Sequence, residues 1–144
     1  MVHYDGPMVL IAVDDFLFRS KIRATAKAAG VDVTFAKSAD EMLELARTLS
    51  PTLAIFDLNS ATLAPVETIA AMKREPALAA IRTLGFVSHV DTARIDAARA
   101  AGADDVLARS AFAGNLADIL LADRTAERGS AASVSGGPGD EVPR

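Results

Sequence analysis

The stretch Leu53–Asn59, LAIFDLN, decides the fold because four apolar residues run directly into an aspartate, Asp57. A proline stands two positions before this stretch, and a short apolar run bounded by turn-forming residues is typical of a buried parallel strand. Val9–Val13, VLIAV, repeats the pattern and runs into Asp14 and Asp15. In an open α/β sheet, ligands bind beyond the carboxyl ends of the strands. We therefore expect carboxylates from two strands at one edge of a sheet.

Composition limits the class of protein. The 144 residues, 51% of them hydrophobic, suit one domain with a full core. A net charge of -4 disfavours DNA binding through a basic surface, and the lack of cysteine excludes thiolate catalysis and disulfides. The N-terminus has no secretory signal, and no apolar run is long enough to span a bilayer. We expect a cytoplasmic protein that binds neither DNA nor membranes.

Expected strands and helices alternate along the chain. The strands are expected at Met8–Val13, Val31–Ala36, Leu53–Phe56, Thr83–Val87 and Asp105–Ala108. The helices are expected at Phe16–Ala29, from Ser38 to near Pro51, from Pro65 to near Arg74, from Asp91 to Gly102, and at Ala111–Leu121. Alternation predicts an α/β fold with a parallel sheet and helices on both faces. The half-exposed strand at 31–36 is expected at a sheet edge, residues 1–7 as a lead, 8–125 as the domain, and 126–144 as a disordered Gly/Ser/Ala/Pro tail.

Asp14, Asp15 and Asp57 are the candidate site. Converging carboxylates repel one another, so at least one should have a raised pKa unless a cation lies among them. Carboxylate oxygens together with a backbone carbonyl suit a hard cation, Mg²⁺ in particular. An alternative interpretation is that Asp14 and Asp15 only cap the following helix, which leaves Asp57 unexplained.

The order of these residues resembles the receiver domain of response regulators in two-component signalling, over Met8–Leu121. The matching residues are Val13-Asp14-Asp15, Asp57 after the third strand, Ser88 after the fourth, Ala101–Asp105 before the fifth and Arg109 after it. The resemblance implies a doubly wound, five-stranded parallel sheet of order 2-1-3-4-5. It also implies a signalling domain and not an enzyme. The only reactions that it would catalyse are its own phosphorylation and dephosphorylation.

Residue roles follow from the same resemblance. Asp57 would accept a phosphoryl group from a histidine kinase or a histidine phosphotransfer protein. Asp15 would bind Mg²⁺ directly, Asp14 mainly through water, and the Asn59 backbone carbonyl would be a further ligand. Ser88 would donate a hydrogen bond to a phosphoryl oxygen once Asp57 is modified.

The chain departs from the family at its signalling positions. Arg109-Ser110 stands where the family has lysine and proline, and arginine is not equivalent to lysine. Val106 replaces the usual aromatic residue, and His89 follows Ser88 where a small residue is usual. The loop after Asp57 also differs, with Ser60, Ala61, Ala64 and Pro65.

These departures leave two hypotheses. One is a receiver that accepts phosphoryl groups but transmits the event atypically. The other is a degenerate pseudo-receiver, used as a phosphorylation-independent interaction or dimerisation module. The small, apolar surface of the fourth helix, Val106 and the last helix would permit a homodimer. With no effector domain in the sequence, output would come from a partner, from self-association or from competition for a kinase.

Basic residues of the first expected helix have two interpretations. Arg19, Lys21, Arg23 and Lys27 form either a solvated face or a docking surface for the phosphotransfer partner. His3 and His89 lack partners at metal-ligand spacing, so neither is expected to bind metal.

Three other functional classes fit less well. A flavodoxin needs a phosphate loop after the first strand, where this chain has carboxylates, and a dinucleotide-binding domain needs G-x-G-x-x-G there. A phosphatase of the aspartyl-phosphate class needs a second Asp at position 16, which is Phe.

Overall fold

Strands and helices alternate in the structure, a computed structural model that describes residues 8–88 and 91–129. The strands are β1 (Met8–Ala12), β2 (Asp32–Phe35), β3 (Leu53–Asp57), β4 (Arg82–Val87) and β5 (Asp105–Ala108). The helices are α1 (Phe16–Ala29), α2 (Ala39–Leu49), α3 (Pro65–Arg74), α4 (Thr92–Ala101), α5 (Arg109–Gly114) and α6 (Leu116–Gly129). None of these helices is long and apolar enough to cross a lipid bilayer.

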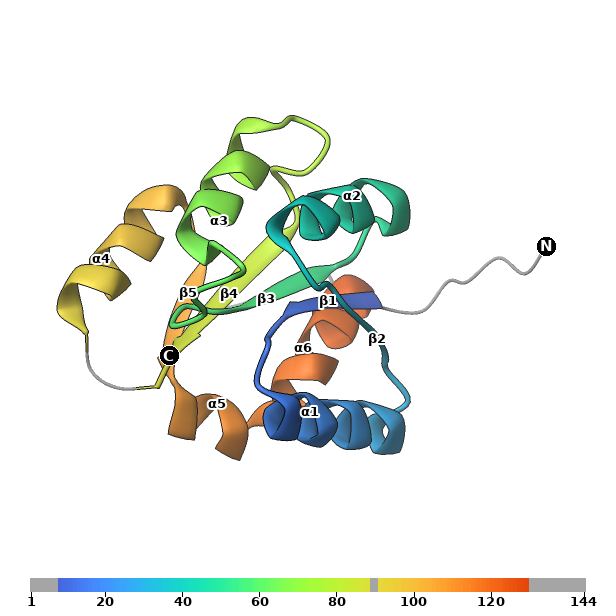
Figure 1. Cartoon of the computed structure of the whole chain (residues 1–144). Helices are drawn as coiled ribbons and strands as arrows, with labels where there is room; N and C mark the ends of the chain where they lie inside the picture. The colour runs from blue at the N-terminus through green and yellow to red at the C-terminus, as the bar shows by residue number, and fades with distance from the viewer. Residues whose placement is uncertain (1–7, 89–90, 130–144) are drawn as a thin grey trace, which may run out of the picture.

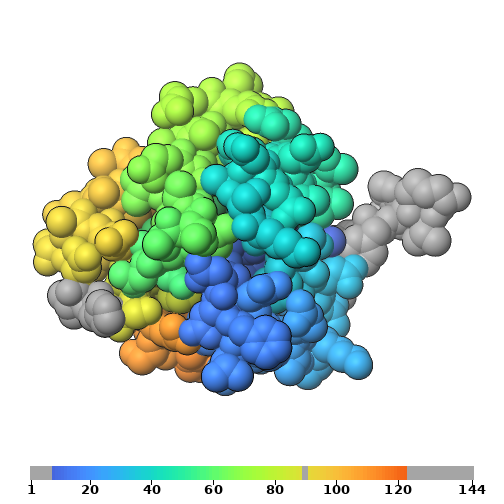
Figure 2. All heavy atoms as spheres, in the orientation of Figure 1, coloured from blue at the N-terminus to red at the C-terminus, as the bar shows by residue number. Residues whose placement is uncertain are grey.

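The strands form one parallel sheet of order β2-β1-β3-β4-β5, as the resemblance predicts, with β2 at an edge. Helices cover both faces (Figure 1): α2, α3 and α4 lie on one side, and α1, α5 and α6 on the other. The space-filling view shows α2 and α3, in cyan and green, side by side at the surface (Figure 2). The doubly wound α/β fold predicted from the sequence is therefore confirmed.

Alternate residues of the central strands bury their side chains on opposite faces. On β1, Leu10 and Ala12 pack with side chains of α2 and α3, whereas Val9 and Ile11 pack with side chains of α1 and α6. All five residues of β3 are buried. Continuous apolar runs are needed for such strands because both faces of the sheet are covered.

The single helix expected at Ala111–Leu121 is wrong, since two helices, α5 and α6, meet at Asn115. The Asn115 side chain donates a hydrogen bond to the Ala111 carbonyl at 2.8 Å, beside the bond from its own backbone N–H. Asparagine competes in this way with the regular helical bonds, which favours a break. Helix α6 continues to Gly129, past the boundary expected at 125, and the lead at 1–7 and residues 130–144 of the expected tail lie outside the described residues.

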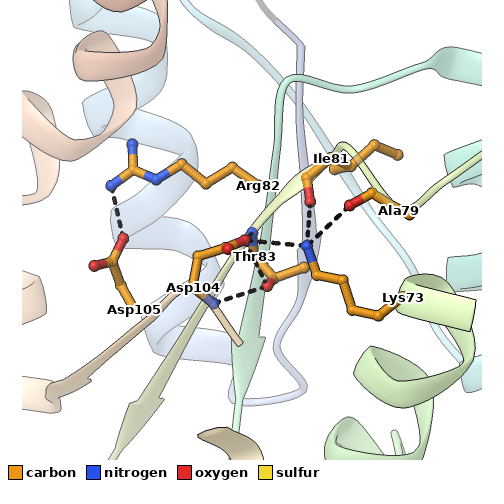
Figure 3. A network of polar contacts seen from close by, with 7 residues as sticks. All are labelled: Lys73, Ala79, Ile81, Arg82, Thr83, Asp104 and Asp105. Atoms are coloured by element: carbon orange, nitrogen blue, oxygen red, sulfur yellow. Dashed lines mark hydrogen bonds and ion pairs between the residues drawn. The ribbon is translucent and has the colours of Figure 1, made fainter. Parts of the chain in front are cut away.

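A polar network joins α3 to the start of β4 and to the loop before β5 (Figure 3). One Asp104 oxygen accepts hydrogen bonds from the Thr83 backbone N–H at 2.8 Å and from its hydroxyl at 3.1 Å. Lys73 lies 3.1 Å from the same oxygen and donates to the carbonyls of Ala79 and Ile81. Gly102, at φ +111°, leaves room for the Lys73 stem, which a Cβ there would meet at 2.7 Å.

We expect Asp104→Asn to lower the free energy of unfolding at pH 7 by about 1–2 kcal/mol, a range that allows for partial exposure of the carboxylate. Burial on its own raises the pKa of Asp104, but the Thr83 amide and Lys73 outweigh it, and the net pKa is lowered. A carboxyl with a lowered folded-state pKa stabilises the fold above its unfolded-state pKa, and this contribution is lost as the pH falls through the folded-state value.

Urea unfolding of parent and variant between pH 7 and pH 3 tests this expectation. The difference in stability should narrow toward the acid end. Asp105→Asn is the matched control, since its pair with Arg82 is 42% exposed on both sides and should contribute less than about 0.5 kcal/mol. An Asp104→Asn effect that is the same at every pH would show that the charge is not the cause.

Candidate functional site

Asp57 is the last residue of β3 and only 6% exposed. Its Oδ1 accepts a hydrogen bond from the Asn59 backbone N–H at 2.9 Å. Burial is the main cause that raises the pKa of Asp57, and the nearby Asp14 and Asp15 carboxylates raise it further. The Asn59 amide and Arg109 oppose the rise without cancelling it. The expectation that one of the three carboxyls titrates high is confirmed, with burial a larger cause than repulsion.

Asp14 is held by the loop that follows Asp57. Its Oδ2 accepts hydrogen bonds from the hydroxyls of Ser60, at 2.8 Å, and Thr62, at 2.9 Å. Ser60 also accepts from the Leu63 backbone N–H, which orders the loop. The sequence analysis did not predict that Ser60 and Thr62 bind Asp14. The available signal was a pair of hydroxyl residues three and five positions after Asp57, an expected site residue.

Asp15 has two partners. Its Oδ1 caps α1 by accepting from the Phe18 backbone N–H at 2.9 Å, so the expected cap is present, although capping is not the only contact of this residue. Its Oδ2 pairs with Arg109 Nη2 at 3.2 Å. The Phe18 amide, followed by Arg109, lowers the pKa of Asp15. The two neighbouring aspartates therefore have different partners. Asp14 accepts from two hydroxyls, whereas Asp15 caps α1 and pairs with the Arg109 guanidinium.

Two side chains connect the loop after β3 to the region after β4. Asn59 Oδ1 accepts from the Ser88 backbone N–H at 2.6 Å. Arg94, in the first turn of α4, donates to the Leu58 carbonyl at 2.9 Å and pairs with Asp91 at 3.2 Å. Sequence analysis did not identify Arg94, because nothing in its local pattern indicates a contact 36 positions away.

The predicted site residues all follow neighbouring strand ends of the sheet: Asp14 and Asp15 after β1, Asp57 and Asn59 at the end of β3, Ser88 after β4 and Arg109 after β5. Their oxygens are of the kind that a hard cation prefers, and within the described residues Asp14 Oδ1 and Asp57 Oδ2 accept no hydrogen bond. As the described side chains stand, no three of the acidic or histidine residues are grouped to share a metal ion. Asp15 faces Arg109 instead, so the donor set fits Mg²⁺ in chemistry, and Asp15 would join it only by exchanging a partner.

No family model and no curated protein matches the sequence, but the structure superposes on solved structures. A protein of Chloroflexus aurantiacus J-10-fl assigned as a response regulator superposes with a TM-score of 0.74 at 21% identity, covering 84% of this chain and 99% of its own. The chemotaxis response regulator CheY4 of Vibrio cholerae superposes at 0.71 with 20% identity, covering 83% of this chain and 99% of its own. A CheY-like receiver domain protein of Methanospirillum hungatei JF-1 superposes at 0.69 with 16% identity, covering 84% and 98%.

The chain has the receiver-domain fold. The resemblance stated from the sequence is confirmed at this level, including the strand order. In this receiver fold, Val106 lies in β5 and Arg109 is the first residue of α5. His3 and His89 lie outside the described residues, so the expectation that neither binds metal stays a prediction.

Proposed function

We propose that this chain is a phosphoacceptor domain of phosphorelay signalling, in which Asp57 accepts a phosphoryl group. The observation that carries the proposal is a buried carboxylate at the carboxyl edge of a receiver fold, with two further carboxylates and an arginine around it. A raised pKa makes the Asp57 carboxylate a stronger nucleophile once it is ionised.

In the proposed reaction, an Asp57 oxygen attacks phosphorus, a new P–O bond forms, and the bond between phosphorus and the donor breaks. Asp57 Oδ2 is the favoured atom, because Oδ1 already accepts from Asn59. The Ser88 hydroxyl is proposed to donate to a phosphoryl oxygen of the product. The Asp57 carboxylate and the incoming phosphoryl group are both negatively charged and repel each other. Arg109 is proposed to offset the negative charge of the phosphoryl group.

Mg²⁺ is the proposed cofactor, with Asp14, Asp15, Asp57 and the Asn59 backbone carbonyl as its ligands. When bound, it would neutralise charge on the incoming phosphoryl oxygens. Asp14 and Asp57 are the better supported ligands, because each keeps an oxygen without a hydrogen bond among the described residues.

The phosphodonor is proposed to be a histidine kinase or a histidine phosphotransfer protein that docks beside α1. Phe16 and Leu17, which follow Asp15 directly, are 73% and 78% exposed. On the same helix, Arg19 and Arg23 lie over the ring of Phe35, the last residue of β2, at 5.4 and 4.7 Å from its centre. Two adjacent exposed apolar side chains next to a basic helix face support this surface as the contact for a partner, because contiguous exposed apolar patches mark protein interaction sites.

Output is proposed to use the surface of α4, β5 and α5, by a partner or by a homodimer. Val106 opens onto a pocket of about 600 Å³ there, lined also by Ser88, Ile95, Arg99 and Arg109. A valine provides no aromatic switch, so any coupling to Asp57 takes another route. One observation favours the alternative function, a phosphorylation-independent module. Asp15, a proposed Mg²⁺ ligand, is paired with Arg109 instead.

Intact mass spectrometry distinguishes the phosphoacceptor function from the phosphorylation-independent module. The chain is incubated with acetyl phosphate, once in Mg²⁺ and once in excess EDTA. The expected result is a gain of one phosphoryl group in Mg²⁺ only. Because acyl phosphates hydrolyse, the same samples are measured with beryllofluoride by NMR. Absence of both the adduct and any beryllofluoride-dependent shift around Asp57 would leave only the phosphorylation-independent module.

A further inference from the structure

Arg109 is held in place by two contacts of different kinds. Its Nη2 lies 3.2 Å from Asp15 Oδ2, and its guanidinium carbon lies 4.2 Å from the centre of the Phe18 ring. Phe18 is itself fixed, with edge-to-face contacts to Phe86 and Phe112 at 5.3 and 5.8 Å. The planar guanidinium can stack on an aromatic ring and pair with a carboxylate at the same time, whereas a lysine ammonium is a compact point charge.

Asp15 is fully engaged in this arrangement. One oxygen caps α1 through the Phe18 amide, and the other faces Arg109. By contrast, Asp14 and Asp57 each keep an oxygen that accepts nothing among the described side chains and amides. Asp15 is therefore the carboxylate whose availability depends on another side chain.

From this geometry we infer that Arg109 is an internal counter-ion of the acidic site, which a divalent cation must displace from Asp15. The inference rests on the proposed metal site and concerns its regulation. Arg109, held by Phe18, lowers the affinity of the site for divalent cations, and when Asp15 turns to a cation the guanidinium is released. Arg109 thereby couples loading of the site to freedom of its own side chain, beside Asp57.

The pair is suited to reversible exchange. The two side chains are 33% and 39% exposed, and an ion pair in contact with water contributes only modestly to stability. Breaking it leaves neither charge buried, so no large desolvation cost opposes the exchange. Arg109 also reaches the pocket beside α4, which offers the released side chain space.

A titration with Mn²⁺ tests the inference, with the EPR signal of the free ion as the measure of binding. Arg109→Gln should bind Mn²⁺ roughly fivefold or more tightly than the parent, since both an ion pair and a ring contact that compete with the ion are lost. Arg109→Lys keeps the charge but loses the planar stacking on Phe18, and should lie between the two. Arg99→Gln is the control for general charge, because Arg99 lines the same pocket in a different helix, and it should stay within roughly twofold of the parent.

The outcomes separate the inference from the proposed function. If the parent binds Mn²⁺ and Arg109→Gln binds equally or less tightly, or if Arg99→Gln gains as much, the counter-ion role is wrong and the metal site stands. If neither the parent nor Arg109→Gln binds, the metal site itself is wrong. Should Arg109→Gln fail to fold, the parent's Arg109 side-chain ¹⁵N–H resonance decides the matter: it should shift on addition of Mg²⁺, and an unchanged resonance at saturating Mg²⁺ would overturn the inference.

Discussion

Asp57→Asn is expected to abolish the phosphoryl adduct that acetyl phosphate forms on the parent chain. An amide keeps the size of the side chain and an acceptor for the Asn59 amide, but it has no anionic oxygen to attack phosphorus. The measurement is intact mass after incubation in Mg²⁺, followed by peptide mapping of the parent adduct. We expect complete loss in the variant, since Asp57 is the one buried carboxylate among Asp14, Asp15 and Asp57.

The matched control is Asp118→Asn, which removes an exposed aspartate in the first turn of α6. It should leave the yield of adduct unchanged. An adduct that persists in Asp57→Asn and maps to Asp14 or Asp15 would assign the acceptor to the end of β1 in place of β3.

Because Asp57 carries a raised pKa, the folded state is penalised when it ionises, so without Mg²⁺ the Asn variant should also be more stable at pH 7.

Phe112→Ala is expected to cause the largest loss of stability, about 3–5 kcal/mol, by leaving a cavity in the core. The ring is fully buried and stacks on Phe86 with centres 4.7 Å apart and an interplanar angle of 8°. It also supports Phe18, on which Arg109 lies. Urea unfolding gives the change in the free energy of unfolding, provided that the denaturant slope is preserved.

Phe16→Ala is the control for this prediction, because it removes the same side chain at a position 73% exposed. It should change stability by less than about 0.5 kcal/mol. A small effect of Phe112→Ala, comparable with that of Phe16→Ala, would mean that the Phe18, Phe86 and Phe112 cluster does not hold α5 to the sheet.

Local pattern was enough to predict most of the fold. Short apolar runs that end in polar residues indicated the strands, and α1, α3 and β5 have the bounds or starting residues expected. The candidate site followed from the same information, because residues after parallel strands meet at one edge of the sheet. The break at Asn115 was missed, since the apolar period continues across it, while the Asn115 backbone leaves the helical conformation and its side chain bonds to the Ala111 carbonyl.

What the sequence by itself determined is which residues reach the site: Asp57 from β3, the aspartates after β1, and Ser88 and Arg109 after their strands. Only the tertiary structure decided how they are paired. Arg109 and Asp15 are 94 positions apart, and their contact depends on the Phe18 ring beneath the guanidinium and on the helix cap that orients Asp15. Likewise, Ser60 and Thr62 reach Asp14 because β1 and β3 are neighbours in the sheet. Strand order brings distant residues together, but the long-range partner of each charge is set by rotamers and packing, which no local pattern encodes.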